Sequence, residues 1–209
     1  MDLAAIKTVG RPRDETREAA ILEATIAVLS DVGYDRLTID AVATKAKASK
    51  ATVYRRWQNK AALVVDALHT LKPVLGPGEV APCIFPDTGS LRGDLLAGLE
   101  KIGNKLSTDE GKLMAAVMTA AARDPELAAA MRTTHEEKRR SCQTVVDRAV
   151  ARGELSSGGG ADMLHEVVPA LMYNRLLIVG EPFDNEFITR VVDDIALPLL
   201  NHNAEAKNR

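Results

Sequence analysis

The chain has 209 residues, of which 46% are hydrophobic and only 3% aromatic, and its formal net charge at pH 7 is −2. This length holds one small and one larger domain, and abundant Ala and Leu favour an all-α protein. The balanced charge excludes a polycation that coats nucleic acid along its whole length, and two cysteines exclude a disulfide framework. Because no signal-peptide-like leader or membrane-spanning apolar run is present, we expect a cytoplasmic protein that does not contact membranes.

The N-terminal segment, residues 1–13, is expected to be a flexible basic arm. Its residues 7–13, KTVGRPR, are mostly polar and are broken by Gly and Pro, which disfavour an ordered helix. A first helix is predicted over about residues 17–32, where apolar residues recur at helical spacing. Gly33 is expected to end this helix as a C-cap.

Residues 33–64, GYDRLTIDAVATKAKASKATVYRRWQNKAALV, contain the most informative pattern of the chain. Thr38 is placed to cap a short helix, because its hydroxyl can accept a hydrogen bond from a backbone N–H of the first turn. From Ile39 onwards, apolar residues follow at i, i+3, i+4 and i+7, which gives this helix one buried face. Lys47 and Ala48 form the predicted turn.

A second short helix is predicted after this turn. Ser49 is placed to cap it, and Val53 and Trp57, four residues apart, should point inward together. The outer face then consists mainly of cationic, hydroxyl and phenol side chains: Lys50, Ala51, Thr52, Tyr54 and Arg55. Such a face suits contacts with DNA phosphates and base edges. Two short helices joined in this way form a helix-turn-helix, whose second helix enters the major groove.

The charge distribution supports this interpretation. Residues 33–60 carry 7 Lys and Arg against 2 Asp and Glu, whereas residues 61–209 carry 16 against 21. A charge cluster alone is usually a solvated surface, but together with the helix-turn-helix pattern it predicts DNA binding. Asn59 can cap a further helix with Lys60 in its first turn. A cation there opposes the helix dipole unless an anion such as a DNA phosphate lies nearby.

This stretch resembles the DNA-binding domain of the TetR family of bacterial transcriptional regulators. The resemblance is carried by the order and spacing of Gly33, Thr38, Ile39, Val42, Ala43, Ala46, Ser49, Thr52, Val53, Tyr54, Trp57, Lys60 and Leu63. One departure is Lys47, because family members often carry Gly in this turn and a left-handed backbone strains other residues. Either the turn differs slightly, or Lys47 accepts the strain and reaches a phosphate.

The motif and the resemblance together place the DNA-binding domain at residues 14–60. The residues expected to contact DNA are Arg11, Arg13, Thr38, Lys47, Ser49, Lys50, Thr52, Tyr54, Arg55 and Lys60. The two arginines of the basic arm would enter the minor groove or lie along phosphates. The alternative is that the arm is only a solubilising tail.

The remaining residues, 61–209, are expected to form a larger helical domain, which brings the whole chain to about nine helices. A helix near residues 63–71 would connect the two domains, and prolines and glycines forbid regular helix from there to about residue 88. Further helices are predicted at residues 91–106, 113–118, 125–153, 162–179 and 184–200. Asp124 should cap the third of these, with Pro125 at its first position, and Pro169 should kink or open the fourth.

The last two predicted helices indicate self-association, because apolar residues occupy nearly every side and need covering on both faces. In the resembled family the two C-terminal helices of each subunit form a four-helix dimer interface, which implies a homodimer interface within residues 162–200. Its candidate residues are Leu164, Val168, Leu171, Phe187, Val191 and Ile195. A monomer with both helices internal is the alternative. Arg175 needs an acidic partner or an anion, and we favour an Asp or Glu across the interface over an acidic effector.

The resemblance also implies a pocket for an unidentified, apolar small-molecule effector between the middle helices and the dimer helices. Candidate lining residues are Met114, Met118, Cys142, Val146, Tyr173 and Leu177, although most residues of this type are simply core. The expected function is a ligand-responsive regulator, most often a repressor in this family. It would bind a palindromic double-stranded DNA operator as a dimer, and the effector would release it.

Enzyme activity, cofactors and structural metals are not expected. The chain lacks a GxSxG, Walker-type, GxGxxG or HExxH motif, and its four histidines have no metal-ligand spacing. Two alternatives stay open. A small-molecule carrier would leave the recognition helix unexplained, and an architectural DNA-binding protein without effector control would leave residues 61–209 without a role.

Overall fold

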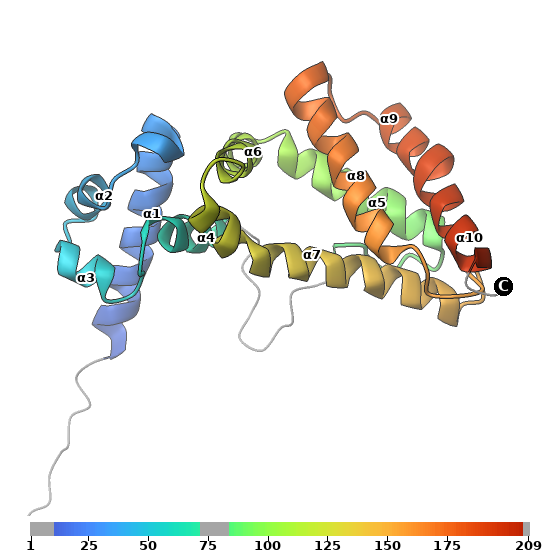
Figure 1. The fold of residues 1–209 in the computed structure, drawn as a ribbon, viewed down its shortest axis with the longest axis horizontal. Coiled ribbons are helices and arrows are strands. Elements are labelled where there is room, and N and C mark those ends of the chain that lie inside the picture. Colours follow the sequence, from blue (N-terminus) through green and yellow to red (C-terminus); the bar gives the residue numbers. More distant parts are fainter. Residues whose placement is uncertain (1–10, 72–83, 207–209) are drawn as a thin grey trace, which may run out of the picture. The chain divides into compact units, whose positions relative to one another are not determined.

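The computed structural model describes residues 11–71 and 84–206, which form nine helical segments and no strand (Figure 1). The expected all-α fold is therefore confirmed. Of the expected basic arm, residues 1–10 lie outside the described residues. Residues 11–13 form the start of α1 (Arg11–Arg36), so this helix begins earlier than the apolar pattern indicated.

The chain divides into two compact units, Met1–Val74 with Ala116–Ala130 and Leu75–Ala115 with Met131–Arg209. We expected the first domain to end at residue 60. Instead α4 (Lys60–Thr70) packs on α1 and belongs to the first unit, because its apolar side chains are buried there.

The three short helices of the first unit begin where the capping pattern indicates. They are α2 (Ile39–Lys45), α3 (Lys50–Tyr54) and α4, and their N-caps are Thr38, Ser49 and Asn59. The cap oxygens accept hydrogen bonds from backbone N–H groups three residues later, at N···O distances of 3.2, 3.1 and 2.9 Å respectively. Each bond satisfies a donor that the helix itself leaves unpaired.

Helix α1 is kinked at Gly33, the residue at which the sequence predicted that the helix ends. Gly33 has φ 75° and ψ 171°, a backbone region that is nearly restricted to glycine. One more helical turn follows, which ends at Arg36, and the N–H of Leu37 donates to the Gly33 carbonyl at 3.2 Å. This kink turns the buried side chains of Tyr34 and Leu37 into the core of the first unit.

Five helices make up the rest of the fold: α5 (Leu91–Leu106), α6 (Asp109–Ala121), α7 (Pro125–Ala151), α8 (Ala161–Asn174) and a final segment from α9 (Asn185–Arg190) to α10 (Leu197–Ala206). α6 and α7 contribute residues to both units. As predicted, Asp124 caps α7 and Pro125 is its first residue. Asp124 Oδ1 accepts the backbone N–H groups of Glu126 and Leu127, each at 3.0 Å.

Wide π-helical turns interrupt both C-terminal helices. One, η1 (Arg175–Val179), follows α8, and the other, η2 (Val191–Ala196), joins α9 to α10. Pro198 accounts for η2, because a proline has no N–H and its ring clashes with the carbonyl four residues earlier in a regular helix. Pro169, where we expected a kink, lies inside α8, and the irregular turn begins only after Asn174.

The second unit has one hydrophobic core, to which α5, α7, α8 and the α9–α10 segment contribute. Its members with at most 1% exposure include Leu95, Leu99, Val145, Val146, Leu164, Met172, Val192 and Leu200. α8 lies beside the α9–α10 segment (Figure 1). Because each such side chain stabilises the fold by about 1.5–3 kcal/mol, this core holds the four elements together.

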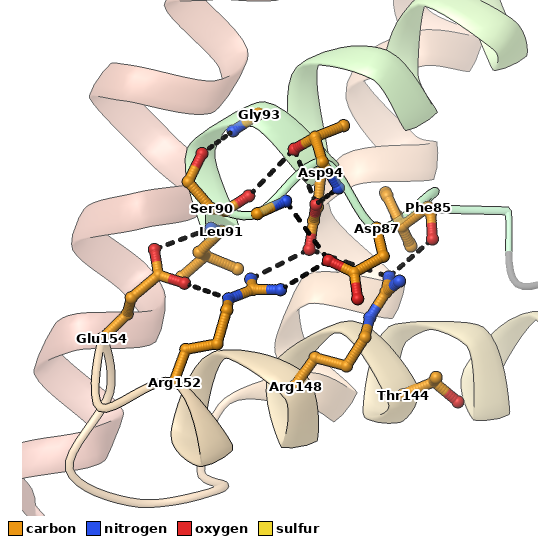
Figure 2. Close-up of polar contacts among 12 residues, drawn as sticks. Phe85, Asp87, Ser90, Leu91, Gly93, Asp94, Thr144, Arg148, Arg152 and Glu154 are labelled. Carbon is orange, nitrogen blue, oxygen red and sulfur yellow. Dashed lines mark hydrogen bonds and ion pairs between the residues drawn. The ribbon is translucent and has the colours of Figure 1, made fainter.

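A buried carboxylate fixes the start of α5 to the end of α7 (Figure 2). The side chain of Asp94 is fully buried. Its Oδ1 accepts the backbone N–H of Thr88 at 2.6 Å and the Thr88 hydroxyl at 2.8 Å, and its Oδ2 accepts from the Arg152 guanidinium at 3.0 Å. Burial alone would raise the pKa of Asp94, but these hydrogen bonds outweigh burial and lower it. The carboxylate is therefore ionised and compensated.

Two further bonds extend this cluster (Figure 2). The guanidinium of Arg148 donates to the Phe85 carbonyl at 2.6 Å, and Glu154 accepts the backbone N–H of Leu91 at 2.7 Å. The segment that precedes α5 is thus tied to α7 and to Arg152 just after it by side chains more than fifty residues away in the chain.

Candidate DNA-binding site

Helices α2 and α3, joined by residues 46–49, form the predicted helix-turn-helix. Val42 and Val53 are completely buried, and Trp57 is 3% exposed. The indole N–H of Trp57 donates to the Asp66 carboxylate of α4 at 2.8 Å, so the apolar ring is buried without leaving its polar atom unpaired. These contacts fix the orientation of α3 on the first unit.

The face of α3 opposite the buried Val53 carries the side chains that we predicted to point outward. Lys50, Tyr54 and Arg55 are exposed, and Thr52 is half-buried. Tyr54 is 55% exposed, which is unusual for a large aromatic side chain and leaves its phenol accessible. Thr52 Oγ1 lies 2.9 Å from Ser49 Oγ, so the two hydroxyls are held together at the start of the helix.

The turn between α2 and α3 contains a left-handed residue. Lys47 has φ 51°, and it is the only non-glycine residue with positive φ in the described ranges 11–71 and 84–206. The N–H of Ala48 donates to the Ala43 carbonyl at 2.9 Å, which closes the turn. A left-handed backbone costs a residue with a Cβ about 1–2 kcal/mol. We expected either a slightly different turn or a strained backbone at Lys47. The structure has the strained backbone, and the Lys47 side chain is exposed at the tip of the turn.

Acidic residues from α1 and α2 pair with three cations of this region. Lys50 Nζ lies 2.6 Å from Asp40 Oδ2, Lys45 Nζ lies 3.2 Å from Asp31 Oδ2, and Arg56 forms an ion pair with Glu18. The Lys50–Asp40 pair joins the first turn of α2 to the first residue of α3. The hydrogen bond from the Lys50 ammonium to Asp40 raises the pKa of Lys50, so this side chain stays charged.

Lys60 lies in the first turn of α4, as predicted, and contacts other residues of its own chain. Its ammonium donates to the Tyr34 carbonyl at 3.0 Å and lies 4.1 Å from the centre of the Tyr34 ring. The Tyr34 hydroxyl in turn donates to Asp124 Oδ2 at 2.7 Å. Burial, together with this hydrogen bond, raises the pKa of Tyr34. The backbone N–H of Leu127 and then the Tyr34 hydroxyl lower the pKa of Asp124. Lys60 therefore belongs to a contact network inside the first unit.

The structure thus brings most of the expected DNA-contacting residues to the turn and to α3: Lys47, Ser49, Lys50, Thr52, Tyr54 and Arg55. Thr38 is exposed at the start of α2, where its hydroxyl serves as the cap. Arg11 and Arg13 lie in the first turn of α1, and their side chains lie outside the described set.

The expected dimer-interface residues occupy two environments. Leu164, Val168, Phe187 and Val191 are buried in the core of the second unit, at 1–9% exposure. These four side chains cover the subunit's own interior and are not available to a partner. Leu171 and Ile195 are half-buried. The outward apolar residues are different: Met163, Leu177, Ile178 and Val179 are 45–78% exposed.

The candidate effector-pocket residues are only partly brought together. Cys142 and Val146 belong to the core of the second unit, and the half-buried Tyr173 packs against it. Burial raises the pKa of Tyr173, so its phenol is neutral. Met118 falls in the first unit, and Leu177 is 53% exposed. Met114 is half-buried and falls in the second unit.

Arg175 has the acidic partner that its burial requires, but within its own chain. Its guanidinium lies 2.8 Å from Glu181 and 3.6 Å from Asp184, and it stacks 4.4 Å from the centre of the Phe187 ring. The expectation of a partner across an interface was therefore wrong. The segment after η1, at the break that the sequence predicted between residues 179 and 184, supplies the carboxylates, but helical spacing did not indicate that it contacts Arg175.

Sequence spacing also missed a histidine pair. His135 of α7 and His165 of α8 have ring centres 4.4 Å apart, with His165 Nε2 3.3 Å from the nitrogens of His135. Burial, and then the neighbouring His135, lower the pKa of His165. The two residues are thirty positions apart, so only the packing of α7 on α8 reveals the pair.

Comparison with known proteins decides the family. The family model described as "Bacterial regulatory proteins, tetR family" matches residues 21–67, and the one described as "Tetracyclin repressor-like, C-terminal domain" matches residues 85–195. The chain belongs to the TetR family. A DNA-binding transcriptional repressor TetR of Mycobacteroides abscessus is 37% identical to this TetR-family protein over 193 residues, 92% of this chain and 98% of the relative.

Two further similarities extend over most of the chain. An uncharacterised HTH-type transcriptional regulator of Mycobacterium tuberculosis is 36% identical over 208 residues, 96% of this chain and 98% of the relative. The crystal structure of a TetR family transcription regulator matches with a TM-score of 0.66 at 30% identity, and covers 87% of this chain and 97% of that chain. This TetR-family protein is therefore a DNA-binding transcriptional regulator with a helix-turn-helix, and the resemblance noted in the sequence is confirmed.

No described helix is long and apolar enough to cross a membrane. No group of three or more His, Cys, Asp or Glu residues in the described ranges could hold a metal ion.

Proposed function

We propose that this chain is a repressor that binds a palindromic DNA operator as a homodimer and is released by a small apolar effector. The observation that carries the proposal is the exposed polar face of α3 and its C-cap Arg55, which is held in place by the buried Val53 and Trp57. A rigidly held helix with an outward phenol and cations suits base and phosphate contacts. The similarity to a named transcriptional repressor supports repression as the direction of control.

A dimer is supported by an apolar stripe along α8 and η1. Met163, Val167, Ala170, Leu177 and Ile178 recur at helical spacing and are exposed or half-buried. Exposed apolar stripes of this kind mark interaction surfaces, and regulators of the TetR family act as dimers. We therefore place the dimer face on this stripe rather than on the buried residues that the sequence indicated.

Effector control is supported by the match of residues 85–195 to a tetracycline-repressor-like C-terminal domain. Within that range, Cys142, Val146 and Tyr173 share one apolar core and are the lining residues that we retain. An effector that enters this core and changes the separation of the two DNA-binding units would weaken operator binding. Such coupling is typically about 1–3 kcal/mol, or about 5–150-fold in affinity.

The proposal is tested with Arg55→Ala and Tyr54→Phe, measured by fluorescence anisotropy on the DNA upstream of the protein's own gene. Each change should weaken binding about 5–150-fold, because a good base contact contributes about 1–3 kcal/mol. Ser30→Ala, an exposed hydroxyl on α1, is the control and should leave affinity unchanged. Sedimentation should show that all three variants remain dimers.

The same experiment separates the alternative functions. A small-molecule carrier would show no loss of DNA binding in Arg55→Ala or Tyr54→Phe, and this result would contradict the proposal. An architectural protein would bind upstream and scrambled duplexes with equal affinity, and the variants would weaken both to the same extent.

A further inference from the structure

The ion pair between Lys50 and Asp40 involves the recognition helix itself. Asp40 lies in the first turn of α2, and its Oδ2 is 2.6 Å from the ammonium of Lys50, the first residue of α3. Both side chains are well exposed, at 60% for Lys50 and 61% for Asp40. An exposed pair of this kind is weak and can be broken by a competing anion, so it modulates binding rather than preventing it.

The position of this acidic residue is informative, because it lies on the helix-turn-helix. Residues 33–60 contain only two acidic residues against seven cations. Asp35 is paired with Arg123 at 3.4 Å, whereas Asp40 is paired with the recognition helix. A DNA phosphate and the Asp40 carboxylate therefore compete for one ammonium. Their mutual repulsion also opposes close approach of any phosphate to this point.

A competing carboxylate affects arbitrary DNA and an operator differently. Binding to arbitrary DNA is almost entirely attraction between cations and phosphates, so it loses strength with each cation that is already neutralised. Binding to an operator adds base contacts that can offset the cost of breaking the pair. Because an operator complex held by base contacts relies less on a phosphate contact from Lys50, the ion pair weakens binding to arbitrary DNA more than binding to the operator. It therefore raises the ratio of specific to non-specific affinity, a form of selection against wrong partners.

We infer that Asp40 is a specificity-determining residue, which restrains binding to arbitrary DNA sequences by holding Lys50 in an ion pair. This inference concerns the DNA-binding activity that the family establishes, and it requires neither an effector nor a known operator. It predicts that removal of the carboxylate strengthens non-specific binding and that this gain depends on the Lys50 ammonium.

The test uses the full-length protein and a labelled duplex of scrambled sequence, with anisotropy measured at several salt concentrations. Asp40→Asn should bind this duplex about 3–10-fold more tightly than the wild type. Its logarithmic salt slope should steepen by up to about 0.9 per protomer, because one more cation now contacts phosphate. In the double variant Asp40→Asn with Lys50→Met, affinity and slope should return to the wild-type values or below.

Asp35→Asn is the matched control, because it removes the same charge from the same unit but from a carboxylate paired with Arg123. Equal gains in affinity for the scrambled duplex in Asp35→Asn and Asp40→Asn would overturn the inference, since they would show that only the net charge of the protein matters. A gain that persists in the double variant would overturn it as well, because Lys50 would not be involved. Circular dichroism should give all variants the same helical content.

The outcomes also distinguish this inference from the proposed function. If the wild type binds upstream and scrambled duplexes equally, the operator proposal fails, while the comparison of Asp40→Asn with its controls on the scrambled duplex still decides the role of Asp40. No binding to any duplex, even at low salt, by the wild type and every variant would overturn both.

Discussion

The surroundings of Asp94 allow its contribution to the stability of the fold to be predicted. It is fully buried, yet both carboxylate oxygens have hydrogen-bond partners, from Thr88 and Arg152. Removal of one partner from a buried charged group typically costs about 3–5 kcal/mol, because the remaining groups stay desolvated. Asp94→Ala should therefore lower the free energy of unfolding in urea by about 3 kcal/mol.

Asp87→Ala is the comparison for this prediction. Asp87 also pairs with Arg152, at 3.0 Å, but its side chain is 61% exposed. Its loss should cost less than about 1 kcal/mol, as for other exposed pairs. Similar small losses in both variants would show that burial of Asp94 has no energetic consequence, contrary to our account.

The lowered pKa of Asp94 gives a pH dependence with a definite sign. Because the folded-state pKa lies below the unfolded value of about 3.9, the carboxylate stabilises the fold above that pH. This stabilisation is lost as pH falls through the folded pKa. The difference in unfolding free energy between wild type and Asp94→Asn should thus be constant near neutrality and shrink below about pH 4. A difference that grows on acidification would contradict this.

Residue-level prediction from the sequence succeeded where partners are close in the chain. The caps Thr38, Ser49 and Asn59 each bond an N–H three residues away, and local pattern is sufficient for such bonds. By contrast, Tyr34 and Asp124 are 90 positions apart, and nothing in either neighbourhood indicates the other. The Lys50–Asp40 pair was missed for a different reason: its partners are near in sequence, but charge counting does not show which cations are already paired.

At the scale of the element, the turn between α2 and α3 contains backbone strain at Lys47, whose effects on stability and on DNA binding can be tested. Lys47 accepts a left-handed backbone that glycine adopts freely. Lys47→Gly should relieve about 1–2 kcal/mol of strain. Glycine also makes the unfolded chain more flexible, by about 0.5–1 kcal/mol. The variant should therefore be as stable as the wild type or slightly more stable in thermal unfolding.

Although Lys47→Gly should not lower stability, it should weaken DNA binding if the Lys47 ammonium contacts a phosphate. Affinity should fall, and the logarithmic salt slope should decrease by about 0.9 per protomer. A variant with unchanged affinity and slope would show that Lys47 tolerates its strained backbone without contacting DNA.

Element-level prediction was best for helices with clear caps and a single apolar face. The structure has α5 at the predicted residues, Leu91–Leu106, and α7 within two residues of its predicted end. The bounds of α8 with η1 also match the predicted helix, whereas α6 (Asp109–Ala121) is longer than the predicted residues 113–118. The assignment of apolar faces was poorest for α8 and the α9–α10 segment, which are apolar on several sides. Periodicity cannot tell which apolar face covers the subunit's own core. Leu164 and Val168 were therefore assigned to a partner, although they are buried in the subunit itself.

At the scale of the whole molecule, binding to a palindromic operator requires a dimer, and we propose that this dimer is built on the exposed stripe of α8 and η1. Ile178 is 78% exposed, so a charge there is compatible with the folded subunit but not with a buried interface. Ile178→Asp should shift sedimentation from dimer to monomer. Because two half-sites are read together, operator affinity should fall with it.

Ser30→Asp, which adds the same charge to the exposed side of α1, serves as the control and should remain dimeric. If Ile178→Asp stays dimeric at the same concentration, the interface lies elsewhere and our assignment of the stripe is incorrect.

The most direct test of the central claim, sequence-specific binding to a palindromic operator, is selection of binding sites from a library of random duplexes with the purified protein. We predict enrichment of one palindromic sequence, with half-sites about 34–36 Å or a multiple of that apart, and loss of enrichment in Arg55→Ala. Recovery of unrelated sequences with steeply salt-dependent affinity would contradict the account, because it would show phosphate attraction without base recognition.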